Sequence, residues 1–190
     1  MSAGKKMPLE IGLIVGGYLK MELKDYVEKI EIVGSVRRKK AEIGDVEVLF
    51  IPKYDNIIPE GEFFETNTNL ADLFLQEKLE TWMLHKRLDI KGAQRWGEKL
   101  KLAEFGIDKI PLDLFACTQE TWICNYVMRT GGKESNTQIA MAAQKKGWEW
   151  RSTGIGFIDA ETKEIAFIPK TERELFEAVG LPYLPPEERK

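Results

Sequence analysis

The segment from residue 45 to residue 51, Asp-Val-Glu-Val-Leu-Phe-Ile, alternates acidic and apolar side chains before it becomes wholly apolar. Such alternation predicts a β-strand, in which residues two apart project to the same face. Asp45 and Glu47 are therefore expected to project together, about 6.6 Å apart along the backbone, with Val46 and Val48 on the opposite face. The segment thus predicts a strand that carries two carboxylates on one face and valines on the other.

Other segments before residue 117 predict a sheet flanked by helices. Further strands are expected at 29–33, 84–91, 99–105 and 112–116. One helix is expected to begin near Pro8, which suits a first helical turn, and another near Asn69, which can cap it. Residues 54–69 carry proline, glycine and several asparagine and threonine residues, so a loop is expected there.

The character of the chain changes near residue 117. Capping residues and glycine stops predict helices after this point, and short segments between them predict strands. The helices are expected from Thr118 to Gly131-Gly132, from about Ser135 to Lys146 and from the capping-box pair Thr171 and Glu174, and the strands at 148–150 and 155–157. We therefore predict an α/β fold in two parts, residues 1–117 and residues 118–190.

Composition narrows the class of protein. The chain has 190 residues, of which 43% are hydrophobic and 31% charged, and its net charge of −3 excludes a uniformly basic wrapper of nucleic acid. No apolar run reaches about eighteen residues and the N-terminus lacks the apolar core of a secretion signal, so neither a membrane span nor secretion is expected. Two cysteines, Cys117 and Cys124, suggest buried thiols in a reducing compartment, and a single histidine, His85, argues against zinc clusters and histidine-dependent triads.

Three carboxylates are the candidate catalytic residues. Asp45 and Glu47 share a strand face, and Asp113 lies between apolar neighbours in the strand 112–116. Adjacent carboxylates repel each other, which raises the pKa of one of them unless a cation is present. Magnesium binds carboxylates together with substrate phosphates, so three carboxylates on neighbouring strands suit a two-metal phosphoryl-transfer site. The alternative is a set of solvated side chains on the exposed face of an edge strand.

The pair Gly34-Ser35 lies where the strand 29–33 is expected to turn into a helix. Glycine allows close approach to the backbone, and free N–H groups at a helix start bind phosphate. The serine hydroxyl can add a hydrogen bond, and Arg38, one turn further on, can hold a phosphate in a fork. The alternative for the basic run from Arg37 to Lys40 is a solvated loop.

At these residues the chain resembles the family X DNA polymerases, within the DNA polymerase β-like nucleotidyltransferase superfamily. The resemblance covers nearly the whole chain, and its Gly-Ser and Asp-x-Glu parts are common to the superfamily. Two later segments narrow it to family X. They are Arg129-Thr130-Gly131-Gly132-Lys133-Glu134-Ser135-Asn136, similar to the thumb motif, and Tyr183-Leu184-Pro185-Pro186-Glu187-Glu188-Arg189, similar to the C-terminal tail.

The resemblance implies a fold and a role for each matching residue. Residues 1–117 would be a catalytic palm, with a mixed sheet flanked by helices, and residues 118–190 a small thumb or nucleotide-binding lobe. Asp45, Glu47 and Asp113 would hold two Mg²⁺ ions, which Mn²⁺ can replace, with Asp113 nearest the primer 3′-hydroxyl. The remaining implied contacts are to the nucleotide, from Gly34, Ser35, Arg38, Gly44, Thr130, Gly131, Gly132 and Asn136.

Three departures from the family pattern accompany this resemblance. Glu47 stands where the family commonly has aspartate, Met128-Arg129 replaces a Tyr-Phe pair that discriminates against ribose, and Ala140 aligns with an arginine that reads the template. We also expect no lyase domain and no helix-hairpin-helix module, so the implied form is a minimal palm and thumb. DNA binding is then expected to be weak or assisted by an accessory DNA-binding protein.

The charge pattern predicts a path for DNA. Residues 82–109 and residues 129–151 each carry a net charge of +3, whereas residues 54–81 carry −6. Phosphate contacts dominate affinity for nucleic acid, so the two basic segments beside the acidic site are the expected DNA contacts. The candidate side chains are Lys99, Lys101, Lys133 and Lys145. Trp96 could stack on a base, although a half-buried core position is the alternative.

The expected function is DNA-directed DNA polymerisation, in which dNTPs are added to a primer 3′-hydroxyl, in short-gap repair synthesis. The expected partners are primer/template DNA, gapped rather than continuous, and a dNTP, bound by a monomer in the cytoplasm or nucleoid of a bacterial, viral or phage system. Two alternatives stay open. One is nucleotidyl transfer to a non-DNA or untemplated acceptor, and the other is a non-catalytic DNA-binding module.

Overall fold

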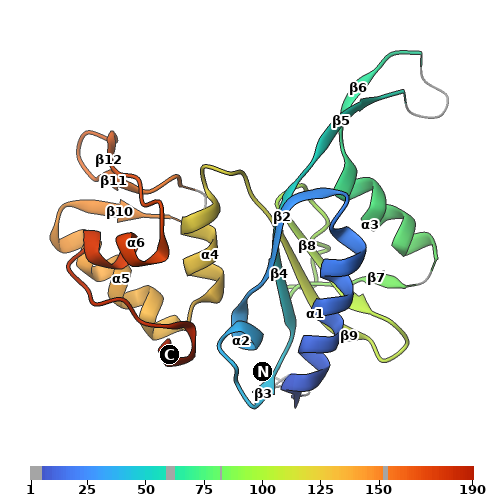
Figure 1. The fold of residues 1–190 in the computed structure, drawn as a ribbon, viewed down its shortest axis with the longest axis horizontal. Coiled ribbons are helices and arrows are strands. Elements are labelled where there is room, and N and C mark those ends of the chain that lie inside the picture. Colours follow the sequence, from blue (N-terminus) through green and yellow to red (C-terminus); the bar gives the residue numbers. More distant parts are fainter. Residues whose placement is uncertain (1–5, 59–62, 82, 152–153) are drawn as a thin grey trace.

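A mixed sheet of five strands forms the centre of the first lobe in the computed structural model, which describes residues 6–58, 63–81, 83–151 and 154–190 (Figure 1). β4 and β9 run parallel at the middle of the sheet, and the other neighbouring strands are antiparallel. In spatial order the strands are β2 (Val27–Ile32), β4 (Val46–Pro52), β9 (Ile110–Ala116), β8 (Leu100–Phe105) and β7 (Leu84–Lys86). We call this part of the chain the sheet lobe.

Two helices cover one face of this sheet. α1 (Leu9–Leu23) and α3 (Leu70–Glu80) pack on it, and the side chains of Val46, Val48 and Leu112 are fully buried in the apolar cluster that includes both helices. Since strand side chains alternate between faces, Glu47 and Asp113 belong to the opposite face. The alternating strand predicted at 45–51 is therefore confirmed as β4, with its carboxylates turned away from the helices.

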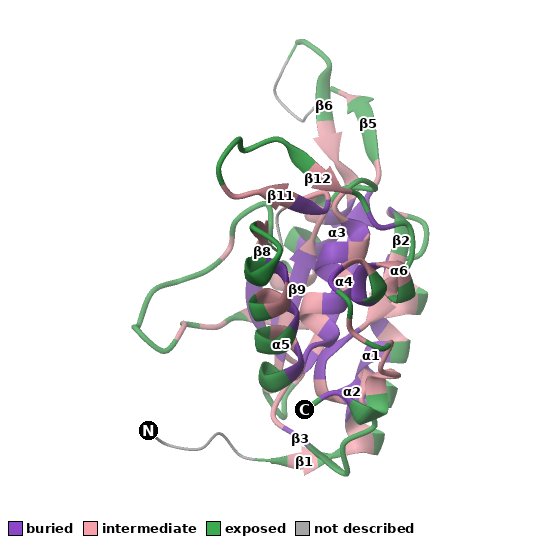
Figure 2. Ribbon diagram, turned by 90° about the vertical axis from the view of Figure 1, so that its left-hand side faces the viewer, coloured by how far each residue is buried: buried purple, intermediate pink, exposed green. Residues whose placement is uncertain are grey.

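The second lobe, which we call the helical lobe, has a core of its own. Cys124, Val127, Phe157 and Phe176 are among its buried residues. Figure 2 shows buried residues along α4, whereas α5 turns mostly exposed residues outward. Its elements are α4 (Trp122–Thr130), α5 (Lys133–Lys145), β10 (Trp148–Trp150), β11 (Phe157–Asp159), β12 (Ile165–Phe167), α6 (Glu172–Ala178) and a 3₁₀ turn (Pro186–Glu188). The exact division at residue 117 stays a prediction.

A third apolar cluster joins the two lobes. Leu49, Ile51 and Phe115, on the face of the sheet opposite α1 and α3, pack with Trp122 of α4. These residues lie beyond the carboxylates along β4 and β9, toward the carboxyl ends of the strands. The helical lobe therefore covers one end of this face and leaves the carboxylates at the edge of the covered region.

Local capping signals predicted several helix starts correctly. The side chain of Asn69 accepts a hydrogen bond of 3.0 Å from the backbone N–H of Asp72, and the hydroxyl of Thr171 accepts one of 3.1 Å from Glu174. These bonds satisfy backbone donors that the first turn of a helix leaves free. The predicted cap at Thr118 is wrong, because Thr118 and Thr121 hydrogen bond to each other in a turn before α4 begins at Trp122.

The segment 54–69 is not wholly a loop. It contains β5 (Tyr54–Ile57) and β6 (Thr66–Asn69), an antiparallel ribbon that projects from the sheet lobe (Figure 1). Its strands bury little on either face, so the alternation that reveals a half-buried strand is missing from the sequence. The short pair β1 (Met7–Pro8) and β3 (Glu42–Ile43), the turn helix α2 (Gly34–Arg37) and β12 complete the described elements, and of these only a helix after Gly34-Ser35 was expected.

Among the helices that the structure describes, none combines the length and the apolar character needed to cross a bilayer.

Candidate active site

Glu47 and Asp113 are register partners on the parallel strands β4 and β9. Residues paired across neighbouring strands point to the same face, so their carboxylates project side by side from the face opposite α1 and α3. Asp45 directly precedes β4, two residues before Glu47, and all three side chains belong to half-buried residues. The structure therefore brings the three predicted carboxylates together, while their catalytic role stays a prediction.

The electrostatics of this cluster favour the protonated acids. Burial raises the pKa of Glu47 to about 8, and the negative charges of Asp45 and Asp113 add to the rise. Burial also raises the pKa of Asp45 and of Asp113, and the positive charge of Arg87 opposes the rise in both. Since burial is the largest cause of each rise, the charged carboxylates are disfavoured here and the cluster favours either a proton or a bound cation.

Gly34 allows the Glu47 carboxylate its position. The backbone φ of Gly34 is +61°, and a Cβ atom built there would overlap the Glu47 carboxylate. The backbone N–H of Val33 also donates a 2.9 Å hydrogen bond to the carbonyl of Glu47, which ties the turn to β4. A glycine is therefore needed here both for its left-handed backbone and for its missing side chain.

The next predicted phosphate ligands are placed near this turn. Ser35 lies in the first turn of α2, and its hydroxyl is buried without a hydrogen-bond partner among the described residues. An orphan hydroxyl is consistent with a polar ligand at this point. Gly44 is half-buried before Asp45, and a Cβ atom there would meet only the Lys6 amine at 3.8 Å, so packing alone does not require glycine at this position.

Arg38 and Arg37 connect the sheet lobe to the helical lobe. Arg38 donates a hydrogen bond to the backbone carbonyl of Thr130, and its Nε is buried without a partner among the described residues. Arg37 donates to the hydroxyl of Thr130 and pairs with both carboxylate oxygens of Glu172, at 2.9 and 2.7 Å. Its guanidinium also stacks 3.8 Å from the centre of the Tyr126 ring. In this structure both arginines therefore make contacts between the lobes.

Glu172 also binds a second arginine from the C-terminal segment. The fully buried Arg189 donates a 2.9 Å hydrogen bond to Glu172 and another to the carbonyl of Leu184. Hydrogen bonds from Arg37 and the charges of both arginines lower the pKa of Glu172 against the effect of burial. No local sequence pattern could have revealed this triad, since its members lie far apart along the chain.

The turn between α4 and α5 places the predicted nucleotide-pocket residues. Gly131 and Gly132 both have positive φ, +47° and +70°, so both conformations favour glycine. Thr130 is buried, and the Asn136 side-chain amide donates a 2.9 Å hydrogen bond to the carbonyl of Met128 while its Oδ1 atom lacks a partner among the described residues. The four residues are brought together here, and the contact of Asn136 with a base edge remains a prediction.

Two arginines beside the carboxylates were not assigned a role from the sequence. Arg87, the residue after β7, forms an ion pair and hydrogen bond with Oδ1 of Asp113. Arg129, in the last turn of α4, stacks 3.9 Å from the centre of the Phe115 ring, and its charge opposes the raised pKa values of Glu47 and Asp113. The contact of Arg87 depends on strand pairing, which the sequence does not specify.

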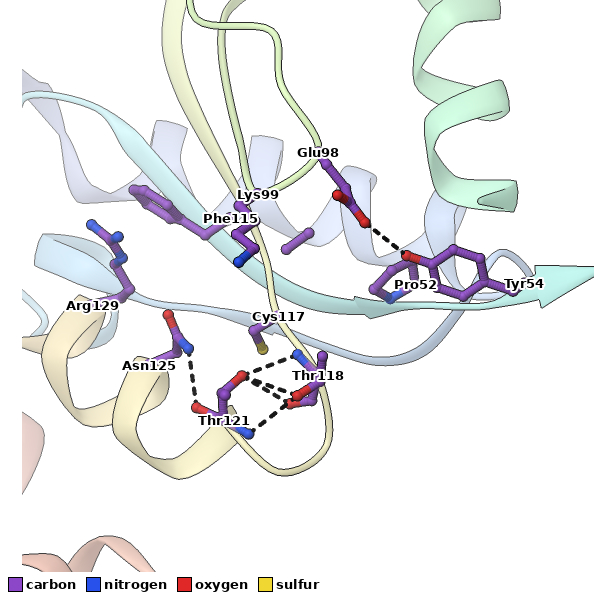
Figure 3. Close-up of a pocket in the computed structure, with 11 residues that line it drawn as sticks. Pro52, Tyr54, Glu98, Lys99, Phe115, Cys117, Thr118, Thr121, Asn125 and Arg129 are labelled. Carbon is purple, nitrogen blue, oxygen red and sulfur yellow. Dashed lines mark hydrogen bonds between the residues drawn. The ribbon is translucent and has the colours of Figure 1, made fainter. Parts of the chain in front are cut away.

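A pocket of about 130 Å³ opens beside this junction (Figure 3). Arg129 and Phe115 lie at one end, Tyr54 and Glu98 lie at the other, and Asn125 lines the side formed by α4. The exposed Lys99 also lines it, so one predicted DNA contact faces the space between the lobes.

The other three lysines that were predicted to contact DNA differ in their exposure to solvent. Lys133 and Lys145 are exposed on α5, where a phosphate could reach them. Lys101 is only 2% exposed and pairs with Asp72 at 2.7 Å, because its place in β8 turns the side chain into the sheet lobe. The predicted DNA contact at Lys101 is therefore wrong. Trp96 is half-buried against the sheet-lobe core, as the alternative to base stacking proposed.

The donor set suits a hard divalent cation by its chemistry. All three candidate ligands are carboxylates, and their mutual repulsion is the cost that a bound cation relieves. Among the described residues, however, no three Asp, Glu, His or Cys side chains are grouped closely enough to hold an ion together. Asp113 is engaged by Arg87 and the Glu47 carboxylate lies over Gly34. The three carboxylates fit Mg²⁺ by their chemistry, and in this structure Asp113 already makes a contact within the protein.

Comparison with known proteins identifies this arrangement. Residues 126–190 match the protein-family model described as DNA polymerase beta thumb. No curated protein matches the chain. Two solved structures of Leishmania infantum polymerase beta are similar to it, a ternary P/T complex with a TM-score of 0.74 at 18% identity and a ternary gap complex with a TM-score of 0.74 at 16% identity.

The similarity extends over both lobes. The first structure matches 99% of this chain and 78% of the Leishmania chain, and the second matches 98% and 71%. Relatives with this fold are thus solved in complex with primer/template DNA. The chain has the palm-and-thumb fold of the polymerase β-like, family X DNA polymerases, with the sheet lobe as palm and the helical lobe as thumb.

Proposed function

We propose that the protein is a DNA polymerase of the family X type, which adds a dNTP to a primer 3′-hydroxyl in short-gap repair synthesis. The observation that supports this most strongly is the pairing of Glu47 with Asp113 across β4 and β9, with Asp45 beside them, in a polymerase β-like palm. A structural role alone does not explain three half-buried carboxylates, of which Asp45 and Asp113 add to the effect of burial in raising the pKa of Glu47.

The triphosphate is assigned to the turn after β2. Ser35 offers an unpaired buried hydroxyl, and the missing side chain of Gly34 lets the Glu47 carboxylate lie beside this turn. Arg38 lies at the end of α2 and would contribute its guanidinium to the β- and γ-phosphates. Because Arg38 now bonds to the Thr130 carbonyl, nucleotide binding would exchange a contact between the lobes for a contact with phosphate.

We assign the reacting groups, the primer 3′-hydroxyl and the α-phosphate of the dNTP, to the carboxylates. Bound divalent cations would supply Lewis-acid activation of the 3′-hydroxyl and neutralise the triphosphate, as in other two-metal sites. Asp45 and Glu47 would bind the cations, on the side of the site where the nucleotide lies. Asp113, on the neighbouring strand, would orient the primer end for in-line attack on the α-phosphate, from which pyrophosphate leaves.

The DNA is assigned to three exposed lysines, Lys99, Lys133 and Lys145. Lys99 lines the pocket between the lobes, and Lys133 and Lys145 lie on the exposed surface of α5. Phosphate contacts of this kind give salt-sensitive binding. The preferred partner in this proposal is a gapped primer/template, bound by a monomer.

One observation favours a second candidate, a non-catalytic DNA-binding module. Asp113 is paired with Arg87, and the described residues hold no assembled metal-binding group. A palm that has lost turnover would keep its fold while protein cations replace metal.

A single assay separates these functions. The protein is incubated with labelled dNTPs and Mg²⁺ on gapped, nicked and single-stranded DNA. We expect templated incorporation that is greatest on the gapped substrate and absent in EDTA. Incorporation on single strands alone would indicate untemplated transfer, and salt-sensitive binding without incorporation would establish the binding module and overturn the proposal.

A further inference from the structure

Arg87 is held in place by the edge of the palm sheet. Its backbone N–H donates a 2.9 Å hydrogen bond to the carbonyl of Leu102 on β8, and its side-chain Nε donates a 3.4 Å bond to the carbonyl of Ala103. The Nη2 atom then reaches Oδ1 of Asp113 on β9. The guanidinium thus spans β8, with one end anchored to backbone and the other on a carboxylate.

Strand register puts this contact in line with the candidate metal ligands. Leu102 is the register partner of Asp113 across β8 and β9, and Asp113 is the register partner of Glu47 across β9 and β4. Arg87, Leu102, Asp113 and Glu47 therefore form one transverse row across the sheet. Asp113 stands between an arginine on one side and the other carboxylates on the opposite side.

The ion pair is only partly shielded from solvent. The Arg87 side chain is 27% exposed and the Asp113 side chain 18% exposed. Such a pair is strong enough to persist in the metal-free protein but does not carry the cost of separating two fully buried charges. A doubly charged cation can therefore compete with the guanidinium for the same carboxylate.

We propose that Arg87 is a displaceable counterion of Asp113, which occupies this carboxylate in the metal-free protein and gives it up when a divalent cation binds. The proposal rests on the function proposed above, since it assigns Asp113 to the metal. In this structure the ion pair engages one carboxylate of the set that fits Mg²⁺. Arg87 is thus a positioning residue that sets the affinity for the cation.

The test measures Mn²⁺ binding by electron paramagnetic resonance, without DNA or nucleotide. The variants are Arg87→Gln, which removes the competing charge, and Arg95→Gln, a matched control on the same segment. Arg95 pairs with Asp89 on the surface, at 2.8 Å, and not with the carboxylate cluster. We expect Arg87→Gln to bind Mn²⁺ roughly tenfold more tightly than the parent protein and Arg95→Gln to bind within about twofold of it.

Asp113→Asn, in the same assay, distinguishes failure of the inference from failure of the proposed function. Weaker binding in Asp113→Asn with unchanged binding in Arg87→Gln would overturn the counterion role and leave the metal site standing. Unchanged binding in Asp113→Asn would overturn the metal site, and the counterion role with it.

Thermal unfolding adds a readout that a purely structural arginine would not move. In EDTA, Arg87→Gln should melt lower than the parent protein because Asp113 loses its partner, but the stabilisation by Mn²⁺ should be larger. If Arg87→Gln does not fold, Arg87→Met replaces it, since methionine keeps much of the aliphatic stem but removes the competing charge. Binding by Arg87→Met that equals the parent's would then overturn the proposal.

Discussion

The palm carboxylates and the contact between the lobes are both built from charged residues, but by different means. In the palm, Glu47 and Asp113 meet because two neighbouring strands share a register, so the backbone itself fixes their separation. Between the lobes, Arg37, Glu172 and Arg189 meet through long side chains from segments far apart in the chain. The first cluster combines three half-buried carboxylates whose pKa values are raised, whereas the second combines two arginines with one carboxylate.

This difference indicates which charged groups are available to bind a ligand. The palm cluster raises the pKa of its acids, chiefly through burial, so a bound cation would relieve a cost that these carboxylates carry when charged. The cluster between the lobes lowers the pKa of Glu172, which is the signature of charges already satisfied. We therefore expect changes in the palm cluster to alter binding and activity, and changes between the lobes to alter stability.

The largest effect on stability is expected from Glu172→Gln. It leaves the half-buried Arg37 and the fully buried Arg189 without their carboxylate, which should lower the free energy of unfolding by about 2 to 4 kcal/mol. The matched control is Glu187→Gln, which breaks the exposed pair of Glu187 with Lys39 between the same two lobes and should leave stability nearly unchanged. Urea unfolding measures both, and equal effects would contradict the distinction between buried and exposed contacts.

The next effect is a pH dependence of the metal-free protein. Because the folded state raises the pKa of Glu47 from its usual value near 4.5 to about 8, the folded state holds a proton that the unfolded state releases between these values. The contribution of Glu47 to the free energy of unfolding is therefore fully present below about pH 4.5. It falls by roughly 1 to 3 kcal/mol as the pH rises to about 8. Urea unfolding in EDTA at pH 5 and pH 8 measures the loss, and Glu47→Gln should remove most of it. A flat profile would refute the shift.

Gly34→Ala tests the turn beneath Glu47. The left-handed backbone should cost about 1 to 2 kcal/mol of stability, and the new methyl group would displace the Glu47 carboxylate, so nucleotide incorporation should fall more than tenfold. Gly17→Ala is the control, because an added Cβ meets nothing within 4 Å on the exposed side of α1 and should stabilise the helix. Full activity in Gly34→Ala would show that Glu47 is not part of the active site.

The smallest effect separates two neighbouring lysines. Lys99→Ala should weaken DNA binding a few-fold and reduce the slope of log affinity against log salt by about one, because one phosphate contact is lost. Lys101→Met, which changes a buried side chain, should leave both quantities unchanged. Fluorescence anisotropy at several salt concentrations measures them, and the reverse pattern would restore Lys101 as the DNA contact.

Much of the palm could be predicted from sequence because its signals are local. The alternation around Val46 and Val48 identified β4 and the face of its carboxylates, and the asparagine and threonine caps at Asn69 and Thr171 identified helix starts. Each signal depends on residues within a few positions of one another, and each is preserved in the folded chain.

The remainder depends on contacts between distant segments. The burial of Lys101 against Asp72, the pairing of Arg87 with Asp113 and the triad around Glu172 all follow from strand order or from docking of the lobes. The composition of a sequence segment does not distinguish a lysine whose side chain is exposed from a lysine of the same basic segment whose side chain points into the core. The β5–β6 ribbon was missed for another reason, since it lacks a buried face that would leave a pattern.

The role of the palm carboxylates is tested most directly by single-nucleotide incorporation on gapped DNA with Mg²⁺, comparing Asp113→Asn with Asp108→Asn. Asp108 is exposed in the turn between β8 and β9, so the same change is made in the turn and in the middle of one strand of the same hairpin. Asp113→Asn should lower the rate at least roughly a hundredfold, while Asp108→Asn stays near the parent rate. Equal, unimpaired rates in the two variants would show that the paired carboxylates of β4 and β9 do not carry the reaction.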